Sequence, residues 1–322
     1  MSPLDAADVS TDHADSPSPT DVRVSDAAAR PDASVSGWRR DAPLPFARQE
    51  IAVGVVRGRI YVLGGFESGR IVANVRVYDP ATDTWTLGPE LPSARHHVAV
   101  ATLGDDLYAL GGMTDLAFTP DSTCYVLRAG AASWQTIAPL PLPRGAGVAG
   151  GVGGRIVVTG GVGTRNTLLV QSAVYDPASD SWRTGAPPLT RREHLAAFVH
   201  GGRLWTVGGR LLSLSSNLAA VESYDPVTDT WRQEAAMPTA RGGLGAAVLG
   251  DVAYVFGGEQ PDRALDTVEA LDLTRGTWRT TAPIPTPRHG MGVAAAGGRI
   301  YVLGGADQPT FAAVPVVESY AP

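Results

Sequence analysis

The chain has 322 residues, of which 38 are glycine and 25 proline, and its 26 basic and 32 acidic side chains give a net charge of −6. This balance provides no basic surface for a nucleic acid or an anionic membrane, so we expect neither as a partner. A single cysteine excludes an internal disulfide, and no apolar run is long enough to span a bilayer.

Residues 1–35 differ in composition from the rest of the chain. They hold seven aspartates and two arginines, a net charge of −5, with no aromatic side chain to anchor a core. We expect a disordered acidic tail here and a nearly neutral folded domain over residues 36–322. The N-terminus lacks the basic and apolar regions of a secretory signal, which favours a cytoplasmic protein.

The folded region repeats one pattern six times. An arginine stands ten residues after a tryptophan and sixteen before a glycine pair, and such a fixed period indicates a repeat fold. The tryptophans are Trp38, Trp85, Trp134, Trp182, Trp231 and Trp278. The arginines are Arg48, Arg95, Arg144, Arg192, Arg241 and Arg288. The glycine pairs are Gly64-Gly65, Gly111-Gly112, Gly160-Gly161, Gly208-Gly209, Gly257-Gly258 and Gly304-Gly305.

Each repeat predicts four short antiparallel strands. After Arg241, small and β-branched residues at 242–249 and 253–256 are separated by a Gly-Asp turn and lead to a glycine pair. Alternating residues at 267–271 and a Thr-Trp segment at 277–280 follow. Four such strands are typical of one blade of a β-propeller, where glycine permits close approach near the axis.

The two ends of the chain complement each other. The last repeat stops at Pro322 without its tryptophan, whereas residues 36–40 carry Trp38 with no strands before it. We therefore predict an all-β ring of six four-stranded blades, in which the N-terminal strand completes the last blade and leaves no long open edge. We expect this ring to be a monomer.

These residues resemble the kelch repeat. Tyr78 is followed by Asp-Pro and a tryptophan seven residues later, and Leu91–Arg95 and Met237–Arg241 reproduce the Leu/Met-Pro-x-x-Arg pattern. The resemblance covers residues 36–322 and implies a propeller with a galactose oxidase-like fold. It does not imply one function, because kelch propellers include protein-binding adaptors, copper oxidases and a sialic acid epimerase.

The six arginines have two interpretations. Because they recur in every repeat, they are candidates for structural hydrogen bonds to backbone carbonyls. The kelch resemblance implies instead that some face the central cavity and bind acidic groups, which suits the planar guanidinium. On the second interpretation the ligand would contact Arg48, Arg95, Arg192, Arg241 and Arg288.

The two positions after each arginine vary. They are Gln49-Glu50, His96-His97, Gly145-Ala146, Glu193-His194, Gly242-Gly243 and His289-Gly290, and they include four of the six histidines. In a closed ring they would meet at one mouth of the channel. Such residues could form a binding surface, an acid–base pair or a metal site, and we favour them in that order.

Radical-copper chemistry is not expected. In the galactose oxidase family a tyrosine is crosslinked to a cysteine, whereas Cys124 here precedes Tyr125 on one strand, where neighbouring side chains point to opposite faces.

We favour a binding module over an enzyme. The module would recognise an acidic peptide or carboxylated ligand at the channel mouth, with no metal or cofactor. The ligand-binding candidates besides the five arginines are His96, His97, Glu193, His194 and His289. The alternative is a sugar-acting enzyme with epimerase-like acid–base chemistry, for which Glu50, Glu193 and His194 are the catalytic candidates. The leucines of residues 211–214, in the loop after the fourth glycine pair, could contact a partner or fold back on their own sheet.

Overall fold

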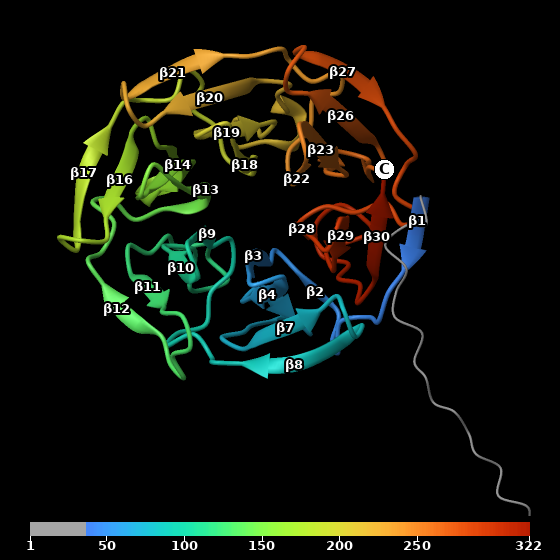
Figure 1. The fold of residues 1–322 in the computed structure, drawn as a ribbon, viewed down its shortest axis with the longest axis horizontal. Helices are drawn as coiled ribbons and strands as arrows, with labels where there is room; N and C mark the ends of the chain where they lie inside the picture. Colours follow the sequence, from blue (N-terminus) through green and yellow to red (C-terminus); the bar gives the residue numbers. More distant parts are fainter. Residues whose placement is uncertain (1–36) are drawn as a thin grey trace, which may run out of the picture. The chain divides into compact units, whose positions relative to one another are not determined.

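The computed structural model describes residues 37–322, which lie within one compact unit, Pro31–Pro322. The expected tail, residues 1–35, falls outside this range. Regular structure is almost entirely antiparallel β-sheet, and six sheets of four or five strands are arranged around a common centre (Figure 1). In the part of the chain described, no helix has the length and apolar character needed to cross a membrane.

In each sheet the innermost strand follows the repeated arginine and pairs with a strand that ends at or runs through the glycine pair. The innermost strands are β3 (Ala52–Val56), β9 (Ala99–Leu103), β13 (Gly145–Val152), β18 (Ala196–His200), β22 (Gly245–Leu249) and β28 (Gly292–Ala296). Their partners are β4 (Arg59–Leu63), β10 (Asp106–Leu110), β14 (Arg155–Gly163), β19 (Arg203–Val207), β23 (Val252–Phe256) and β29 (Arg299–Leu303).

The third and fourth strands lie progressively further from the centre (Figure 1). The third strands are β7 (Val75–Asp79), β11 (Cys124–Leu127), β16 (Ser172–Asp176), β20 (Val221–Asp225), β26 (Val268–Asp272) and β30 (Val317–Ala321). The fourth strands are β8 (Thr84–Gly88), β12 (Gln135–Ile137), β17 (Ser181–Gly185), β21 (Thr230–Gln233), β27 (Thr277–Thr280) and β1 (Gly37–Arg40).

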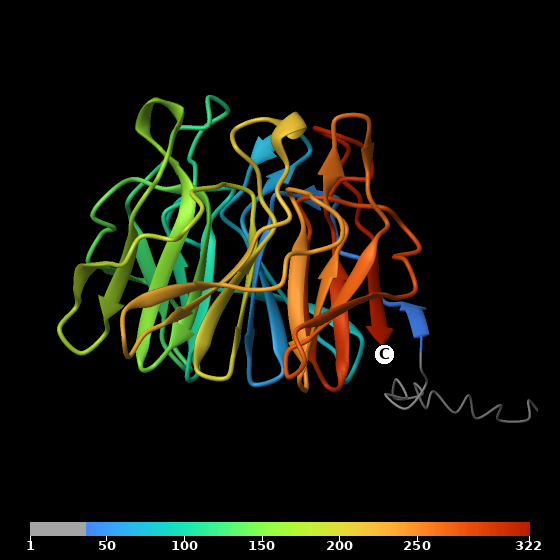
Figure 2. The same cartoon turned by 90° about the horizontal axis from the view of Figure 1, so that it is seen from above.

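Short elements follow the glycine pairs at one end of the sheets, which we call the loop face; the gold turn of η2 marks it in Figure 2. They form small pairings of their own beside the arginine segments, as between Arg48 and Glu67. The elements that follow glycine pairs are β5 (Phe66–Glu67), β6 (Arg70–Ile71), η1 (Thr164–Asn166), β15 (Thr167–Leu168), η2 (Leu214–Ser216), β24 (Glu259–Gln260) and β25 (Arg263–Ala264). Strand β2 (Arg48–Gln49) is the arginine segment that pairs with β5.

The sheet of β28, β29 and β30 takes its fourth strand from the other end of the described chain. Strand β1 pairs antiparallel with β30, and Trp38 lies opposite Tyr320. The Trp38 ring packs on Tyr320, with 5.1 Å between centroids, and edge-on against Phe256 of the preceding sheet at 6.0 Å. Strand β1 therefore carries the aromatic side chain that this sheet needs to pack on its neighbour.

The repeated tryptophans also join each sheet to the one before it. The indole nitrogen of Trp85 donates to the carbonyl of Ala42, which follows β1, at 2.9 Å. The corresponding indole of Trp38 donates to Ala282, which follows β27, at 3.2 Å. The other four tryptophans make the same kind of bond, to Pro89, Ala138, Ala186 and Ala235.

Trp38→Ala should lower the free energy of unfolding by about 3 kcal/mol, because it removes an aromatic ring packed between two sheets and leaves a carbonyl without its donor. Urea unfolding of the purified protein measures this change. Arg40→Ala, on the same strand but with an exposed side chain, is the control and should leave stability nearly unchanged. Equal stability of the two variants would contradict the assigned packing of β1.

Candidate functional site

The six repeated arginines are buried in the sheets and do not line the central cavity. Their exposed fractions lie between 0% and 3%. Burial lowers the pKa of Arg144 to about 10, which still leaves its guanidinium charged at neutral pH. A guanidinium held this deeply cannot also meet a ligand in the channel.

The guanidinium groups bond to backbone carbonyls of their own sheet. Arg95 and Arg144 each donate to the carbonyl of the first glycine of the pair, sixteen residues later. Arg288 donates to Gly304 in the same way, at 3.2 Å. In these three repeats the spacing of arginine and glycine pair is the spacing of a hydrogen bond, whereas Arg48, Arg192 and Arg241 donate to other carbonyls of their sheets. Both patterns fit the structural interpretation of these residues.

The second glycine of each pair makes the complementary contact with the next sheet. Its amide donates to the carbonyl of the following repeat's arginine, as Gly65 does to Arg95 at 2.9 Å and Gly305 does to Arg48 at 2.8 Å. Gly304, the first glycine of its pair, has a φ of +55°, and a Cβ there would lie 2.6 Å from the carbonyl oxygen of Arg48. Glycine is needed because both the backbone angle and the close approach exclude a side chain.

The second position after each arginine forms an inner ring at the mouth of the cavity. All six residues adopt left-handed backbone angles, with φ between 51° and 66°. Their backbones are linked in sequence by hydrogen bonds, from His97 to Glu50, from Ala146 to His97 and onward. The six residues are Glu50, His97, Ala146, His194, Gly243 and Gly290.

These residues surround one end of a cavity of about 190 Å³. The walls below them are the small and β-branched side chains of the innermost strands, such as Val53 and Ala149. The only polar side chains in its lining, among residues 37–322, are those of Glu50, His97 and His194. Three of the residues at the variable positions therefore line the cavity, while the arginines beside them point into the sheets.

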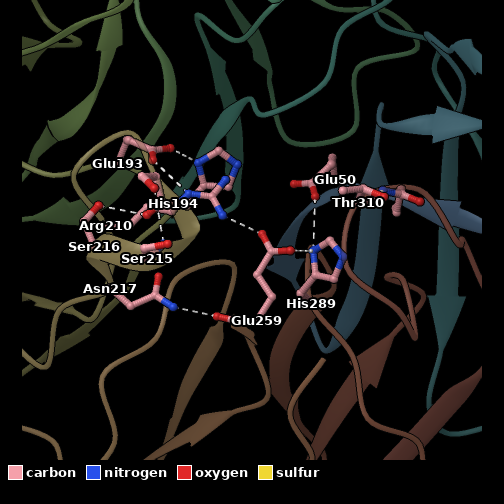
Figure 3. Close-up of polar contacts among 12 residues, drawn as sticks. Glu50, Glu193, His194, Arg210, Ser215, Ser216, Asn217, Glu259, His289 and Thr310 are labelled. Carbon is pink, nitrogen blue, oxygen red and sulfur yellow. Dashed lines mark hydrogen bonds and ion pairs between the residues drawn. The ribbon is translucent and has the colours of Figure 1, made fainter. Parts of the chain in front are cut away.

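Seven side chains form a closed polar circuit at this mouth, several of them visible in Figure 3. His194 Nδ1 contacts the Glu193 carboxylate, and His194 Nε2 lies 2.9 Å from His97 Nε2. His97 Nε2 is 3.0 Å from a Glu50 oxygen. The circuit continues through His289 and Glu259, with contacts of 3.6 and 3.5 Å at His289 Nδ1, and returns through Arg210 to Glu193.

The circuit shifts the pKa values of its members. Burial would raise the pKa of Glu50, yet His97 and His289 outweigh it and hold this pKa well below its ordinary value. Burial and the charges of Arg210 and His97 lower the pKa of His194 well below its ordinary value. Burial lowers the pKa of His289, but the hydrogen bond and charge of Glu50 reverse this, so the net shift is upward.

His96 lies behind the inner ring. Burial and the neighbouring His97 lower its pKa to about 4. Its Nδ1 contacts Nδ1 of His97, and its Nε2 lies 3.0 Å from the carbonyl oxygen of Asp115. Its ring packs on Phe66, with 4.2 Å between centroids. His96 therefore supports His97 and is not itself part of the cavity lining.

The acid–base candidates are not arranged as an available pair. Glu193 is 3% exposed, and its two oxygens are occupied by His194 and by Arg210 Nε, the latter at 2.9 Å. Arg210 also donates to Glu259 at 2.6 Å. Sequence analysis did not single out Arg210 or Glu259; each directly follows a glycine pair, and that position was its only signal.

A groove on the loop face lies beside the mouth. It has a volume of about 690 Å³ and is lined by the loops after the second, third and fourth glycine pairs, with Phe118, Arg165 and Leu212 among its residues. Phe118 is 40% exposed and Leu212 41%. All three have left-handed φ angles, of 60°, 58° and 64°, which are rare for bulky residues and store strain. The loop leucines are thus partly exposed, as a partner contact requires.

Both family models that match this chain describe kelch repeats. The KLHDC2/KLHL20/DRC7 Kelch-repeats domain matches residues 151–317, and the Kelch motif matches residues 47–92. Beta-scruin of Limulus polyphemus is 28% identical over 196 residues, 59% of this chain and 16% of scruin. Kelch-like protein terF of Aspergillus terreus is 26% identical over 186 residues, 53% of this chain and 40% of terF.

The chain therefore matches less than half the length of each of these two relatives. Among solved structures, that of YjhT superposes with a TM-score of 0.72 at 15% identity and covers 86% of this chain and 96% of its own. At this identity the similarity concerns the fold alone.

Arg288→Ala should lower the free energy of unfolding by about 3 kcal/mol, because it leaves the buried Glu318, now 2.6 Å from the guanidinium, with only the exposed Arg40 at 3.5 Å as a counter-charge. Chemical denaturation measures the loss. Arg275→Ala, whose side chain is 80% exposed, is the matched control and should have wild-type stability. A fully stable Arg288→Ala protein that had lost ligand binding would show instead that this arginine is a ligand contact.

Proposed function

Because this chain belongs to the kelch-repeat family, we propose that it is a six-bladed β-propeller, closed by strand β1, that binds a protein partner on its loop face. Its three-strand set β28, β29 and β30 becomes a full blade only with β1. Closure is supported by three hydrogen bonds between the last sheet and the first. The Trp85 indole donates to the Ala42 carbonyl, the Gly305 amide to the Arg48 carbonyl, and the Ile51 amide to the Gly290 carbonyl.

Protein binding is the common activity of kelch-repeat proteins. In this chain the observation that carries the proposal is the strained, partly exposed lining of the loop-face groove. Three loops each place at least one left-handed residue there, and these residues are Phe118, Arg165, Asn166 and Leu212. Strain of this kind persists only where the surrounding structure enforces it, and it concentrates at functional sites.

The chemistry of the groove defines the partner. Phe118 and Leu212 provide apolar contacts, and desolvated aromatic contacts contribute strongly to protein interfaces. Arg165 is exposed, and among residues 37–322 no acidic side chain forms an ion pair with it. An acidic side chain of the partner would find its counter-charge there. The ligand is thus a peptide segment with an apolar and an acidic residue, and Arg165, not the buried repeat arginines, supplies the cation.

We do not propose the sugar-acting alternative. It needs an acid and a base facing the cavity, but Glu193 is enclosed by Arg210 and His194. The low pKa of Glu50 keeps this carboxylate ionised and makes it a poor proton donor at neutral pH.

Selection of a displayed peptide library on the purified protein should enrich peptides that combine apolar and acidic residues. Phe118→Ser and Arg165→Glu should each weaken binding of a selected peptide about tenfold or more, through lost apolar contact and reversed charge respectively. Isothermal titration calorimetry measures both effects.

Val227→Ser is the matched control, because Val227 is 90% exposed on the turn between β20 and β21, outside the groove. It should bind like the wild type. Selected peptides that bind all three variants equally, or a library from which nothing is enriched, would contradict the groove as the binding surface.

A further inference from the structure

Three potential metal ligands converge at the mouth of the cavity from three different sheets. Glu50, His97 and His194 precede β3, β9 and β18 respectively. One ligand atom of each lies within 4.8 Å of the other two. The two Nε2 atoms are 2.9 Å apart, and His97 Nε2 is 3.0 Å from Glu50 Oε2.

The hydrogen bonds behind the two histidines direct nitrogen lone pairs toward this point. His194 Nδ1 carries the proton that Glu193 accepts, so the Nε2 of a neutral His194 is unprotonated. His96 Nε2 donates to the Asp115 carbonyl at 3.0 Å, and the Nδ1 of a neutral His96 then accepts from His97 Nδ1. The Nε2 of a neutral His97 is therefore unprotonated as well.

Two lone pairs and a carboxylate oxygen thus face one another at hydrogen-bond distance. Without a positive charge between them these three atoms repel. The three carboxylates of the circuit, Glu50, Glu193 and Glu259, outnumber its single guanidinium, Arg210, so the circuit attracts a cation to this point. A cation at this point would relieve the repulsion.

We propose that Glu50, His97 and His194 bind one divalent transition-metal ion at the mouth of the central cavity. Two imidazole nitrogens and one carboxylate suit ions such as Zn²⁺ or Fe²⁺. Ligand atoms about 2.1 Å from a tetrahedral ion are about 3.4 Å apart. The observed 2.9 and 3.0 Å therefore need only small side-chain movements.

The residues that contact the ligands from behind also suit a metal. Histidine ligands commonly donate their other ring nitrogen to a carboxylate, which fixes the ring and makes the ligand more basic. Glu193 performs this role for His194 and is itself held by Arg210 at 2.9 Å. Because three protein ligands leave at least one coordination position open, a small oxygen-donor ligand in the cavity could complete the site.

Binding of Zn²⁺ and Co²⁺ to the tag-free, chelator-treated full chain tests the proposal. We expect one ion per chain by isothermal titration calorimetry, and visible Co²⁺ absorption bands that Zn²⁺ displaces. His97→Ala, His194→Ala and Glu50→Gln should each weaken binding at least 100-fold, and Glu193→Gln about 10–100-fold.

His200→Ala is the matched control. His200 lies on β18 with its side chain 26% exposed and its Nε2 3.4 Å from Asp251, outside the cavity lining. This variant should keep wild-type affinity. Equal affinity of His97→Ala, His194→Ala and the wild type, or no saturable binding of either ion, would overturn the proposal.

A measurement on the wild type avoids any folding defect of the variants. Crystals grown with Zn²⁺ should give an anomalous difference peak between Glu50, His97 and His194, and a peak only at other residues would overturn the site. The groove also contacts Glu193 and His194, and Phe118 packs against His97 with 5.7 Å between ring centroids. The anomalous peak is therefore measured on the wild type, where no groove residue is changed, and it tests the metal site whether or not the groove binds a peptide.

Discussion

The structure depends on a buried guanidinium that holds the end of a strand. Each repeated arginine lies inside its sheet and donates to backbone carbonyls there, in three cases to the first glycine of its pair. Its own carbonyl accepts the amide of the second glycine in the preceding repeat. One residue therefore fixes both the position of a strand within its sheet and the junction with the next sheet. Neither residue can change alone, because loss of the arginine leaves buried carbonyls without a donor and a side chain at the first glycine would clash with the next arginine's carbonyl.

The residues that form the framework are therefore different from those that carry the polar side chains at the cavity mouth. The residue after the arginine faces the loop that follows the glycine pair, and the next residue adopts a left-handed angle at the cavity mouth. Each repeat thus offers two positions whose side chains do not affect the hydrogen bonds of the framework. Three repeats fill the inner position with Ala or Gly, while the others place Glu50, His97 and His194 there. The residues proposed to be functional are thus those that differ between otherwise similar repeats.

Much of the fold could be predicted from the sequence, because the repeat encodes backbone hydrogen bonds at fixed spacing. The strand order, the role of the glycine pairs and the polar mouth all followed from it. The direction of the arginine side chains did not, since a recurring arginine suits a carbonyl partner and an anionic ligand equally well. The convergence of His97 and His194, nearly a hundred residues apart in the chain, depends on the angle between sheets, as does the groove formed by Phe118, Arg165 and Leu212. No local pattern encodes such distances.

The same arginine–glycine hydrogen bond joins all neighbouring sheets, including the last and the first. Native-state hydrogen exchange of the second-glycine amides tests it most directly, because every one of them donates to an arginine carbonyl. The Gly305 amide, bonded to Arg48 at 2.8 Å, should exchange as slowly as those of Gly112 and Gly209. Rapid exchange at Gly305 alone would show that the last and first sheets separate and that their junction differs from the others.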